Sequence, residues 1–394
     1  MQLNAEPKFH EELLHWMSQI PYRGGDVGEL LDVAGRIRAG DAESWLDEFV
    51  ELAERVGSET PSDRRGRRDQ HFRAASYYRA ADFFTKSNPA DPRIDSLWAA
   101  ALRHFDEAIA LMEPPGERVA IDAESFQVPA VVYRAASGDE PRPALLMFNG
   151  FDGSQEEMLH VSGLAALERG FNVVTFEGPG QPTVVRRQRE HFRPDWERVV
   201  SPVVDFVSRL PFIDPGRLGL LGLSFGGYLA PRAAAFEPRL RAVAAIDGFF
   251  DVFEGFMQNL PAAIRQSFDE GNVEAFNRRF NEFADTSLGL RWYRDQGMWA
   301  FGEGTPFAFV DALKRYSLRG VAQSIRCPLL VGEGADDAFF KGQAEQLTRA
   351  VGKNATLRRF TSEHSAGGHA RAGAYVYGNS VVLDWFAAQF GTAP

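Results

Sequence analysis

Apolar residues recur three and four positions apart through the first 112 residues, and proline or glycine separates one such repeat from the next. This spacing places apolar side chains along one face of a helix. It predicts helices over residues 9–20, 27–39, 42–56, 68–84 and 93–112. We therefore expect residues 1–112 to form a helical layer. Its aromatic stretch Tyr77–Phe84 is expected to pack internally, with the alternative that some of its rings face a substrate cavity.

The pattern changes after the sequence Pro-Pro-Gly at residues 114–116. Short β-branched and apolar runs, divided by Gly, Pro and Asp, now alternate with helical stretches. Such alternation is typical of a mostly parallel sheet covered by helices, so the predicted fold class is α/β. Eight strands are predicted, over residues 118–121, 125–134, 144–149, 172–176, 218–222, 242–246, 328–332 and 356–360.

The stretch between the sixth and seventh predicted strands is far longer than an ordinary connection between such elements. It covers residues 249–324, its pattern is helical, and it is rich in Phe, Trp and Tyr. We expect it to form a cap inserted into the sheet domain. Residues 113–248 and 325–394 are then the two parts of one core.

Composition narrows the possible classes of function. The 394 residues are 44% hydrophobic and 25% charged, and the formal net charge is −11. A negative chain is a poor partner for nucleic acid, which binds clustered Lys and Arg, and the basic run 64–68 is expected to be a solvated helix start. We find neither a signal-peptide pattern nor the roughly 18 apolar residues of a membrane span, so we expect a cytoplasmic protein. The single cysteine, Cys327, excludes an internal disulfide and a cysteine metal cluster.

The candidate nucleophile is Ser224, which lies in the G-x-S-x-G sequence of residues 222–226. The motif follows the fifth predicted strand and precedes a helical stretch, so the chain must turn sharply at the serine. Glycine suits both flanking positions because a Cβ there would collide with neighbouring backbone. The motif alone arises by chance in a glycine-rich chain. Its place between strand and helix is what indicates an exposed, reactive hydroxyl.

A serine hydroxyl needs an imidazole to take its proton and a carboxylate to orient that imidazole. The predicted base is His369, which follows the eighth strand and the small residues 366–368, so its loop can fold back over the serine. The alternative base, His364, is otherwise a surface or supporting residue. The acid is expected on the loop after the seventh strand. Asp337 has the usual G-x-x-D spacing there, and Asp336 remains the alternative.

Two backbone N–H groups must bind the negative oxygen of a tetrahedral intermediate. The first is expected from Phe225, the residue after the nucleophile. The second is expected from the stretch 149–153, most suitably from Phe151, because Gly150 lets the backbone approach the reacting carbonyl. A plain tight turn is the alternative for that stretch. This chemistry uses side chains and backbone donors alone, so we expect no cofactor, and the other histidines show no metal-site spacing.

These motifs resemble those of the α/β-hydrolase group that includes the 2,6-dihydroxypseudooxynicotine hydrolase of nicotine degradation and the fungal pigment hydrolases that shorten a heptaketide. The resemblance extends over nearly the whole chain. One departure is Pro182, where the group often has Gly, and it would reshape the loop after the fourth strand. The resemblance is carried by residues 25–27, 40–45, 77–81, 149–158, 176–181, 222–228, 336–340 and 366–373.

The resemblance implies an α/β-hydrolase fold, in which the helical layer and the cap cover the active site, and a homodimer. Members of the group hydrolyse esters or carbon–carbon bonds next to a carbonyl. With the aromatic cap, this favours cleavage of a C–C bond in a bulky aromatic ketone or polyketide-like small molecule. Glu177 and Asp247 lie at strand ends, where each either assists in protonating a carbanion leaving group or serves structure alone.

Other functions stay open at this point. A carboxylesterase or thioesterase acting on a similar molecule would use the same catalytic residues. A peptidase of the acylaminoacyl type would be expected to carry a propeller of repeated strands, whereas the first 112 residues are helical in pattern. A non-catalytic binding protein would have no need for the full set of catalytic positions, which are all filled.

Overall fold

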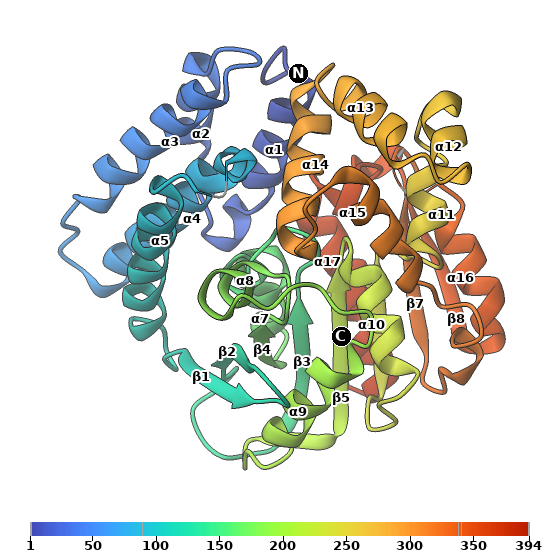
Figure 1. Cartoon of the computed structure of the whole chain (residues 1–394). Helices are drawn as coiled ribbons and strands as arrows, with labels where there is room; N and C mark the ends of the chain where they lie inside the picture. Colours follow the sequence, from blue (N-terminus) through green and yellow to red (C-terminus); the bar gives the residue numbers. More distant parts are fainter. Residues whose placement is uncertain (1, 89, 338, 340, 393–394) are drawn as a thin grey trace.

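The computed structural model describes residues 2–88, 90–337, 339 and 341–392. In this part of the chain, eight strands form one sheet in the order β1-β2-β4-β3-β5-β6-β7-β8 (Figure 1). β2 is antiparallel to both of its neighbours, and all other neighbouring pairs are parallel, which confirms the predicted mostly parallel sheet. The strands are β1 (Glu117–Asp122), β2 (Gln127–Tyr133), β3 (Arg142–Phe148), β4 (Asn172–Phe176), β5 (Ile213–Leu223), β6 (Ala242–Ile246), β7 (Leu329–Gly334) and β8 (Ala355–Phe360).

The central strands are apolar on both faces because helices cover both faces of the sheet. In β3, Leu146 and Phe148 belong to one buried apolar cluster, while Leu145 and Met147 belong to a second cluster on the opposite face. The first face is covered by α9 (Glu197–Val207), α10 (Gly226–Ala234) and α16 (Gln343–Val351). The second is covered by η3 (Leu159–Gly163), α7 (Leu164–Glu168) and α17 (Tyr375–Phe390).

The chain before β1 is helical, as its apolar spacing predicts. The basic run starts α4 and is largely exposed, and the Asp63 carboxylate caps that helix by accepting from the Gly66 N–H at 2.9 Å. The helices of this region are α1 (Pro7–Ser18), η1 (Ile20–Tyr22), α2 (Val27–Arg36), α3 (Ala42–Gly57), α4 (Arg64–Ala81), η2 (Asp82–Ser87) and α5 (Arg93–Ala110).

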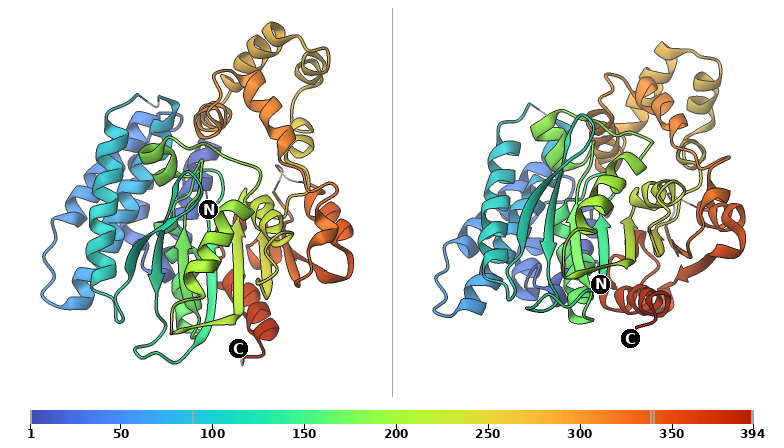
Figure 2. Two further views of the ribbon diagram at one scale, coloured as in Figure 1. Left: turned by 60° about the horizontal axis from the view of Figure 1, so that its bottom comes forward. Right: turned by 90° about the horizontal axis from the view of Figure 1, so that it is seen from below.

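The long connection between β6 and β7 forms a second group of helices, here called the cap. They are α11 (Val252–Met257), α12 (Ala262–Asp269), α13 (Val273–Ala284), α14 (Leu288–Phe301), α15 (Pro306–Ala312), η4 (Leu313–Arg315) and η5 (Ala322–Ser324). Figure 2 shows these helices, in yellow to orange, rising from the core, with the N-terminal helices in blue beside them. Helices α1 and α14 are in contact, so two segments far apart in the sequence meet above the sheet.

The remaining short helices connect the elements of the core. They are α6 (Gln155–Met158), α8 (Pro182–Gln188), η6 (Gly352–Asn354), η7 (Ser362–His364) and η8 (His369–Arg371). Among all helices in the described residues, none combines the length and the apolar character that crossing a membrane requires.

Candidate active site

Ser224 occupies the turn between β5 and α10. Its φ angle is 58°, in the left-handed region that residues with a side chain rarely adopt. Two glycines near it have no space for a side chain, whereas a Cβ on Gly226, the second glycine of the motif, would come no closer than 3.3 Å to its nearest neighbour, the Phe148 ring. A Cβ on Gly222 would overlap the backbone oxygen of Gly226, and one on Gly227 would overlap that of Asp247. The sharp turn expected from the motif is therefore present, and the Ser224 side chain lines a cavity.

His369 lies on the loop after β8 and faces the serine. Its Nε2 is 2.9 Å from the Ser224 Oγ, a hydrogen-bond distance that permits proton transfer. The loop approaches closely because Gly367 has no side chain, and a Cβ there would overlap the Asp336 carboxylate. His364 is exposed, and its ring stacks on Tyr377 with centroids 4.3 Å apart. The structure brings His369, and not His364, to Ser224.

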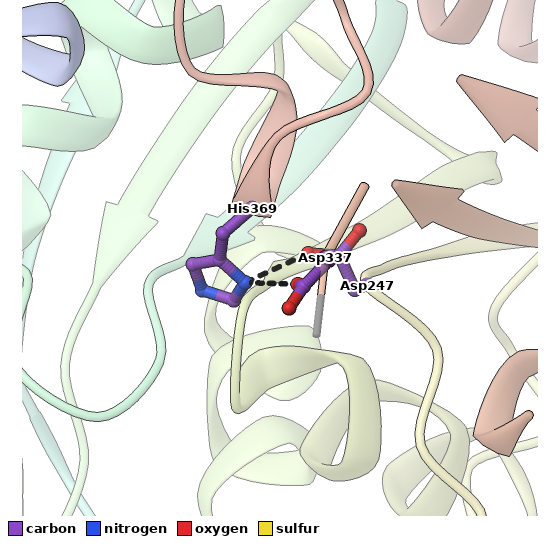
Figure 3. A group of neighbouring side chains, drawn as sticks. All are labelled: Asp247, Asp337 and His369. Atoms are coloured by element: carbon purple, nitrogen blue, oxygen red, sulfur yellow. Dashed lines mark hydrogen bonds and ion pairs between the residues drawn. The ribbon is translucent and has the colours of Figure 1, made fainter. Parts of the chain in front are cut away.

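Two carboxylates contact the other nitrogen of His369, as Figure 3 shows. Its Nδ1 lies 2.6 Å from Asp337 Oδ2 and 3.1 Å from Asp247 Oδ2. Asp247 also accepts from the Ala370 N–H at 2.8 Å, so its carboxylate is held in place by the loop that carries the histidine. The other sequence candidate, Asp336, is exposed. Of the two adjacent aspartates, only Asp337 meets the imidazole.

The two carboxylates determine the charge of the histidine. Burial lowers the pKa of His369, but the charges and hydrogen bonds of Asp337 and Asp247 outweigh it, so that its pKa stands well above 6.5. Burial raises the pKa of Asp247, and its contacts with His369 and the Ala370 N–H bring the pKa below its usual value. The arrangement therefore favours an imidazolium between two carboxylates, the state that forms when serine gives up its proton.

Metal ions are often held by three or more His, Cys, Asp or Glu side chains. In the described part of the chain, Asp247, Asp337 and His369 are the one such group whose possible ligand atoms all lie within 4.8 Å of one another. Two of these contacts involve a single imidazole nitrogen at hydrogen-bond distance, and the second nitrogen of that ring meets Ser224. This geometry suits a proton-transfer chain.

Phe225 and Phe151, the predicted oxyanion donors, line the same cavity as Ser224 and His369. The backbone of Gly150 packs directly against the turn that carries Ser224, since a Cβ on Gly150 would overlap the Phe225 backbone nitrogen. Within the described residues, the N–H groups of Phe225 and Phe151 donate to no protein acceptor. Both donors are therefore available to a ligand, and their role in catalysis stays a prediction.

A second chain of polar contacts runs from helix α1 to residues 149–153, the segment expected to supply an oxyanion donor and here called the oxyanion loop. His15 Nε2 lies 3.0 Å from Glu157 Oε1, and that oxygen also accepts from Asn149 Nδ2 at 2.9 Å. Asn149 Oδ1 in turn accepts from the Gly150 N–H at 2.7 Å. On the other side of the ring, the Tyr375 hydroxyl is 2.6 Å from His15 Nδ1. The N-terminal layer thus helps to shape the loop that carries Phe151.

The contact between His15 and Glu157 shifts the pKa values of both side chains. Burial lowers the pKa of His15, but the adjacent Glu157 raises it above its usual value. Burial raises the pKa of Glu157, and His15, Arg79 and Asn149 together bring it below its usual value. Sequence reasoning missed this pair, because 142 positions separate the two residues and nothing in the stretch 149–158 indicated that Glu157 contacts His15.

The cavity above Ser224 has a volume of about 170 Å³ and two unlike walls. The polar wall, from the N-terminal layer, consists of Lys8, Glu11, Glu12, His15 and Arg79. The aromatic wall, from the cap, consists of Phe256, Phe280, Phe283, Trp292, Tyr293 and Phe301.

The aromatic stretch of the N-terminal layer divides between the two expected roles. Phe83 lines the cavity beside these walls. Tyr77 is buried in the layer, where its hydroxyl donates to Glu29 at 2.5 Å. The alternative of a cavity-facing ring therefore applies to one end of this stretch.

Comparison with known proteins agrees with this architecture. A family model described as "Alpha/beta hydrolase family" matches residues 145–376, and one described as "Esterase FrsA-like" matches residues 28–258. The chain belongs to the α/β-hydrolase family. This α/β-hydrolase is similar to hydrolase acrC of Aspergillus aculeatus, with 33% identity over 371 residues that cover 87% of this chain and 86% of the relative.

Two further relatives have informative names. The 20-hydroxy-prefusarin hydrolase FUS2 of Gibberella moniliformis is 33% identical over 352 residues, covering 85% of this chain and 84% of its own. The crystal structure of the 2,6-dihydroxy-pseudo-oxynicotine hydrolase matches with a TM-score of 0.74 at 21% identity, covering 95% of this chain and 97% of that one, and shares the fold. The expected resemblance and fold are confirmed, and the chain is a hydrolase.

The remaining residues singled out in the sequence have different positions. Glu177 is buried outside the cavity lining and accepts from the backbone N–H groups of Gln155 at 2.9 Å and Thr183 at 2.5 Å. Burial, with the nearby Glu156, raises the pKa of Glu177 to about 7. Pro182 is the first residue of α8, where its fixed φ suits a helix start. Asp247 follows β6 directly, and that position at a strand end was the signal for it.

Proposed function

We propose that this hydrolase cleaves a carbon–carbon bond next to a carbonyl in a bulky aromatic ketone or polyketide-like metabolite. Ser224 is the nucleophile, His369 the base, and Asp337 the residue that orients His369. The observation that carries the proposal is the unbroken line of hydrogen bonds from Asp337 through His369 to Ser224, at the base of a cavity with an aromatic wall.

In the first step, the Ser224 Oγ forms a bond to the carbonyl carbon while His369 Nε2 takes the hydroxyl proton. The carbonyl oxygen becomes negative and is bound by the N–H groups of Phe225 and Phe151. Asp337 and Asp247 stabilise the imidazolium that forms.

In the second step, the tetrahedral intermediate collapses and the carbon–carbon bond breaks. Its electron pair moves to the leaving carbon and is delocalised into an aromatic ring or a second carbonyl of the substrate, and that fragment takes the proton held by His369. Water, activated by His369, then attacks the acyl group on Ser224 and releases a carboxylic acid. One water molecule is consumed in total.

The aromatic wall supports the substrate class. Its rings offer flat apolar surfaces that suit a substrate with its own ring or conjugated system. FUS2, which is similar to this chain over most of its length, is named for a hydroxylated prefusarin. We expect a small molecule to bind in this cavity, and the homodimer implied by the resemblance stays a prediction.

An esterase is the second candidate function. The first step is the same, and only the leaving group differs, since an alkoxide or thiolate departs in place of a carbanion. The match of residues 28–258 to an esterase family model favours this candidate.

The proposed catalytic set is tested by labelling with a fluorophosphonate and mapping the modified peptide by mass spectrometry. We expect modification at Ser224 in the wild type and its loss in His369→Ala. Absence of label on Ser224 in folded wild-type protein would contradict the proposal.

The reaction is tested with a matched pair of substrates, an aryl β-diketone and an ester in which oxygen replaces the leaving carbon. Cleavage of the diketone to an acid and a ketone, lost in Ser224→Ala, supports C–C hydrolysis. Turnover of the ester alone would assign the protein to the esterases.

A further inference from the structure

The oxyanion loop is held from the cap as well as from the core. On the cap side, the Phe151 ring stacks on Tyr293, with centroids 5.1 Å apart and planes at 17°. The Phe151 carbonyl oxygen accepts a hydrogen bond from Gln296 Nε2 at 2.9 Å. Tyr293 and Gln296 are three positions apart on α14, so they present one face of that helix to the loop.

The core holds the same loop through a different glutamine. Gln181, after β4, donates from Nε2 to the carbonyl oxygens of Asn149 at 2.6 Å and Gly150 at 3.2 Å. The Gly150 carbonyl and the Phe151 N–H belong to one rigid peptide plane. The peptide that carries the donor is therefore fixed by Gln181 on one side, and the next peptide is fixed by Gln296 on the other.

The environment of Gln296 indicates a specific contact with Phe151. Its side chain is 1% exposed, and 145 positions separate it from Phe151. The Oε1 of Gln296 has no hydrogen-bond partner among the described residues, so the contact to Phe151 is the one its amide makes. The reversed amide would place two oxygens against each other, which fixes its orientation.

We infer that Gln296 is a positioning residue that completes the oxyanion site from the cap, so that the Phe151 N–H points correctly only while α14 is in place. This inference rests on the proposed function. The hydrogen bond and the stacked ring act on Phe151, which meets the substrate, and Gln296 itself lies outside the cavity lining. Catalysis is thereby coupled to the position of the cap.

The helix that carries Gln296 is also attached to the N-terminal layer. The indole N–H of Trp292 donates to the Phe83 carbonyl oxygen at 3.0 Å, and the two rings stack with centroids 4.8 Å apart. Both covering regions therefore determine where α14 lies, and through Gln296 both influence the second oxyanion donor.

The test is Gln296→Met, which keeps the length of the side chain and removes the donor. The matched control is Gln266→Met on α12, where the glutamine is exposed and its side-chain amide donates to Glu270. Two inhibitors are compared. A trifluoromethyl ketone forms a tetrahedral adduct with Ser224 and needs the oxyanion donors, and a non-reactive alcohol of the same shape fills the cavity without them.

We expect Gln296→Met to lower kcat by about 10- to 100-fold with KM changed less than about twofold, because the interaction acts in the transition state. Affinity for the trifluoromethyl ketone should fall in parallel, while affinity for the alcohol and all values for the control stay at the wild-type level. A merely structural role would lower the melting temperature without separating the two inhibitors.

Unchanged trifluoromethyl ketone affinity in folded Gln296→Met overturns the inference. Gln296→Leu, which is smaller and also lacks the donor, gives the same comparison if the Met variant does not fold. Failure of the proposed function and failure of this inference are distinguishable. If the fluorophosphonate does not label Ser224 in the wild type, the proposed function is contradicted. If the wild type is labelled and Gln296→Met is unaffected, only the role of Gln296 is contradicted.

Discussion

The polar and aromatic walls of the cavity are held in place by different kinds of interaction. The polar wall is attached to the core by directional contacts: His15 lies 3.0 Å from Glu157, and Ser18, on the same helix α1, accepts from the Gly373 N–H through its Oγ at 2.6 Å. The aromatic wall is attached mainly by ring contacts, such as the stack of Phe256 on Tyr293 at 5.5 Å.

This difference has a physical consequence. Hydrogen bonds and ion pairs weaken steeply with distance and angle, so they define one geometry, whereas apolar contact is non-directional and tolerates small shifts. We infer that the polar wall fixes the shape of the site and that the aromatic wall adapts to the substrate. Neither wall supplies the proposed reacting groups Ser224, His369 and Asp337, which lie in the core.

If the walls recognise the substrate and the core residues carry out the reaction, substitutions in the core must cause the largest loss of turnover. We expect Asp337→Asn to lower kcat by about 10³- to 10⁴-fold, since the amide no longer stabilises the imidazolium or its productive tautomer. Steady-state kinetics with the preferred substrate measure this loss.

Asp247→Asn is the matched comparison, because Asp247 contacts the same nitrogen at the longer distance of 3.1 Å. We expect a loss of about tenfold. His369 must be neutral to act as base, so kcat/KM rises as the pH passes through its raised pKa. Removing one carboxylate lowers that pKa and moves the rise to lower pH. Equal losses in the two variants would show that the carboxylates share the role.

The contacts of Trp292 with the N-terminal layer are expected to contribute strongly to the free energy of unfolding. Trp292 is 7% exposed, stacks on Phe83, and has the Lys8 ammonium 4.9 Å from its ring centroid. Trp292→Ala should lower the free energy of unfolding by about 3–5 kcal/mol. Trp292→Phe, which keeps a ring and loses the N–H, should lower it by about 1 kcal/mol. Urea unfolding measures both, and equal losses would contradict the importance of the stack.

The directional character of the polar wall predicts a pH-dependent stability. Because its pKa is raised in the folded state, His15 stabilises the fold below pH 6.5. This stabilisation is lost as the pH rises through the pKa of His15 in the folded protein. Because its pKa is lowered in the folded state, Glu157 stabilises the fold above pH 4.5. This stabilisation is lost as the pH falls through the pKa of Glu157 in the folded protein. The pair therefore contributes most between pH 4.5 and 6.5.

We expect Glu157→Gln to lower the free energy of unfolding by about 1.5–3 kcal/mol in that window, and by less near pH 9. Unfolding curves at several pH values check this. A deficit that does not vary with pH would mean that packing, and not charge, is lost.

Phe256 belongs to the aromatic wall but is not one of the groups argued above to hold Phe151, so its loss should affect binding alone. Phe256→Ala is expected to raise KM for a bulky aromatic substrate about tenfold, which corresponds to about 1.4 kcal/mol, and to leave kcat nearly unchanged. For a short aliphatic ester KM should stay the same, because such a substrate does not reach this ring. A loss in kcat of similar size would show that this wall takes part in catalysis, which would break the distinction between the walls.

Local features of the sequence determined most of the fold and part of the site. Alternation and spacing predicted all eight strands and the helical regions around them, because an element buries side chains at its own period. The turn at Ser224 was predictable because its glycines contact backbone that lies close to them in the chain or in the adjoining strand. His369 was predictable from its place after the last strand and the small residues that precede it.

Only the tertiary structure decided which side chains meet. It selected Asp337 over the adjacent Asp336, and it added Asp247, 122 positions before His369, as a second carboxylate. It also paired His15 with Glu157 and Gln296 with Phe151. A contact between distant positions depends on how strands and helices pack in three dimensions, and the local period of a sequence carries no information about it.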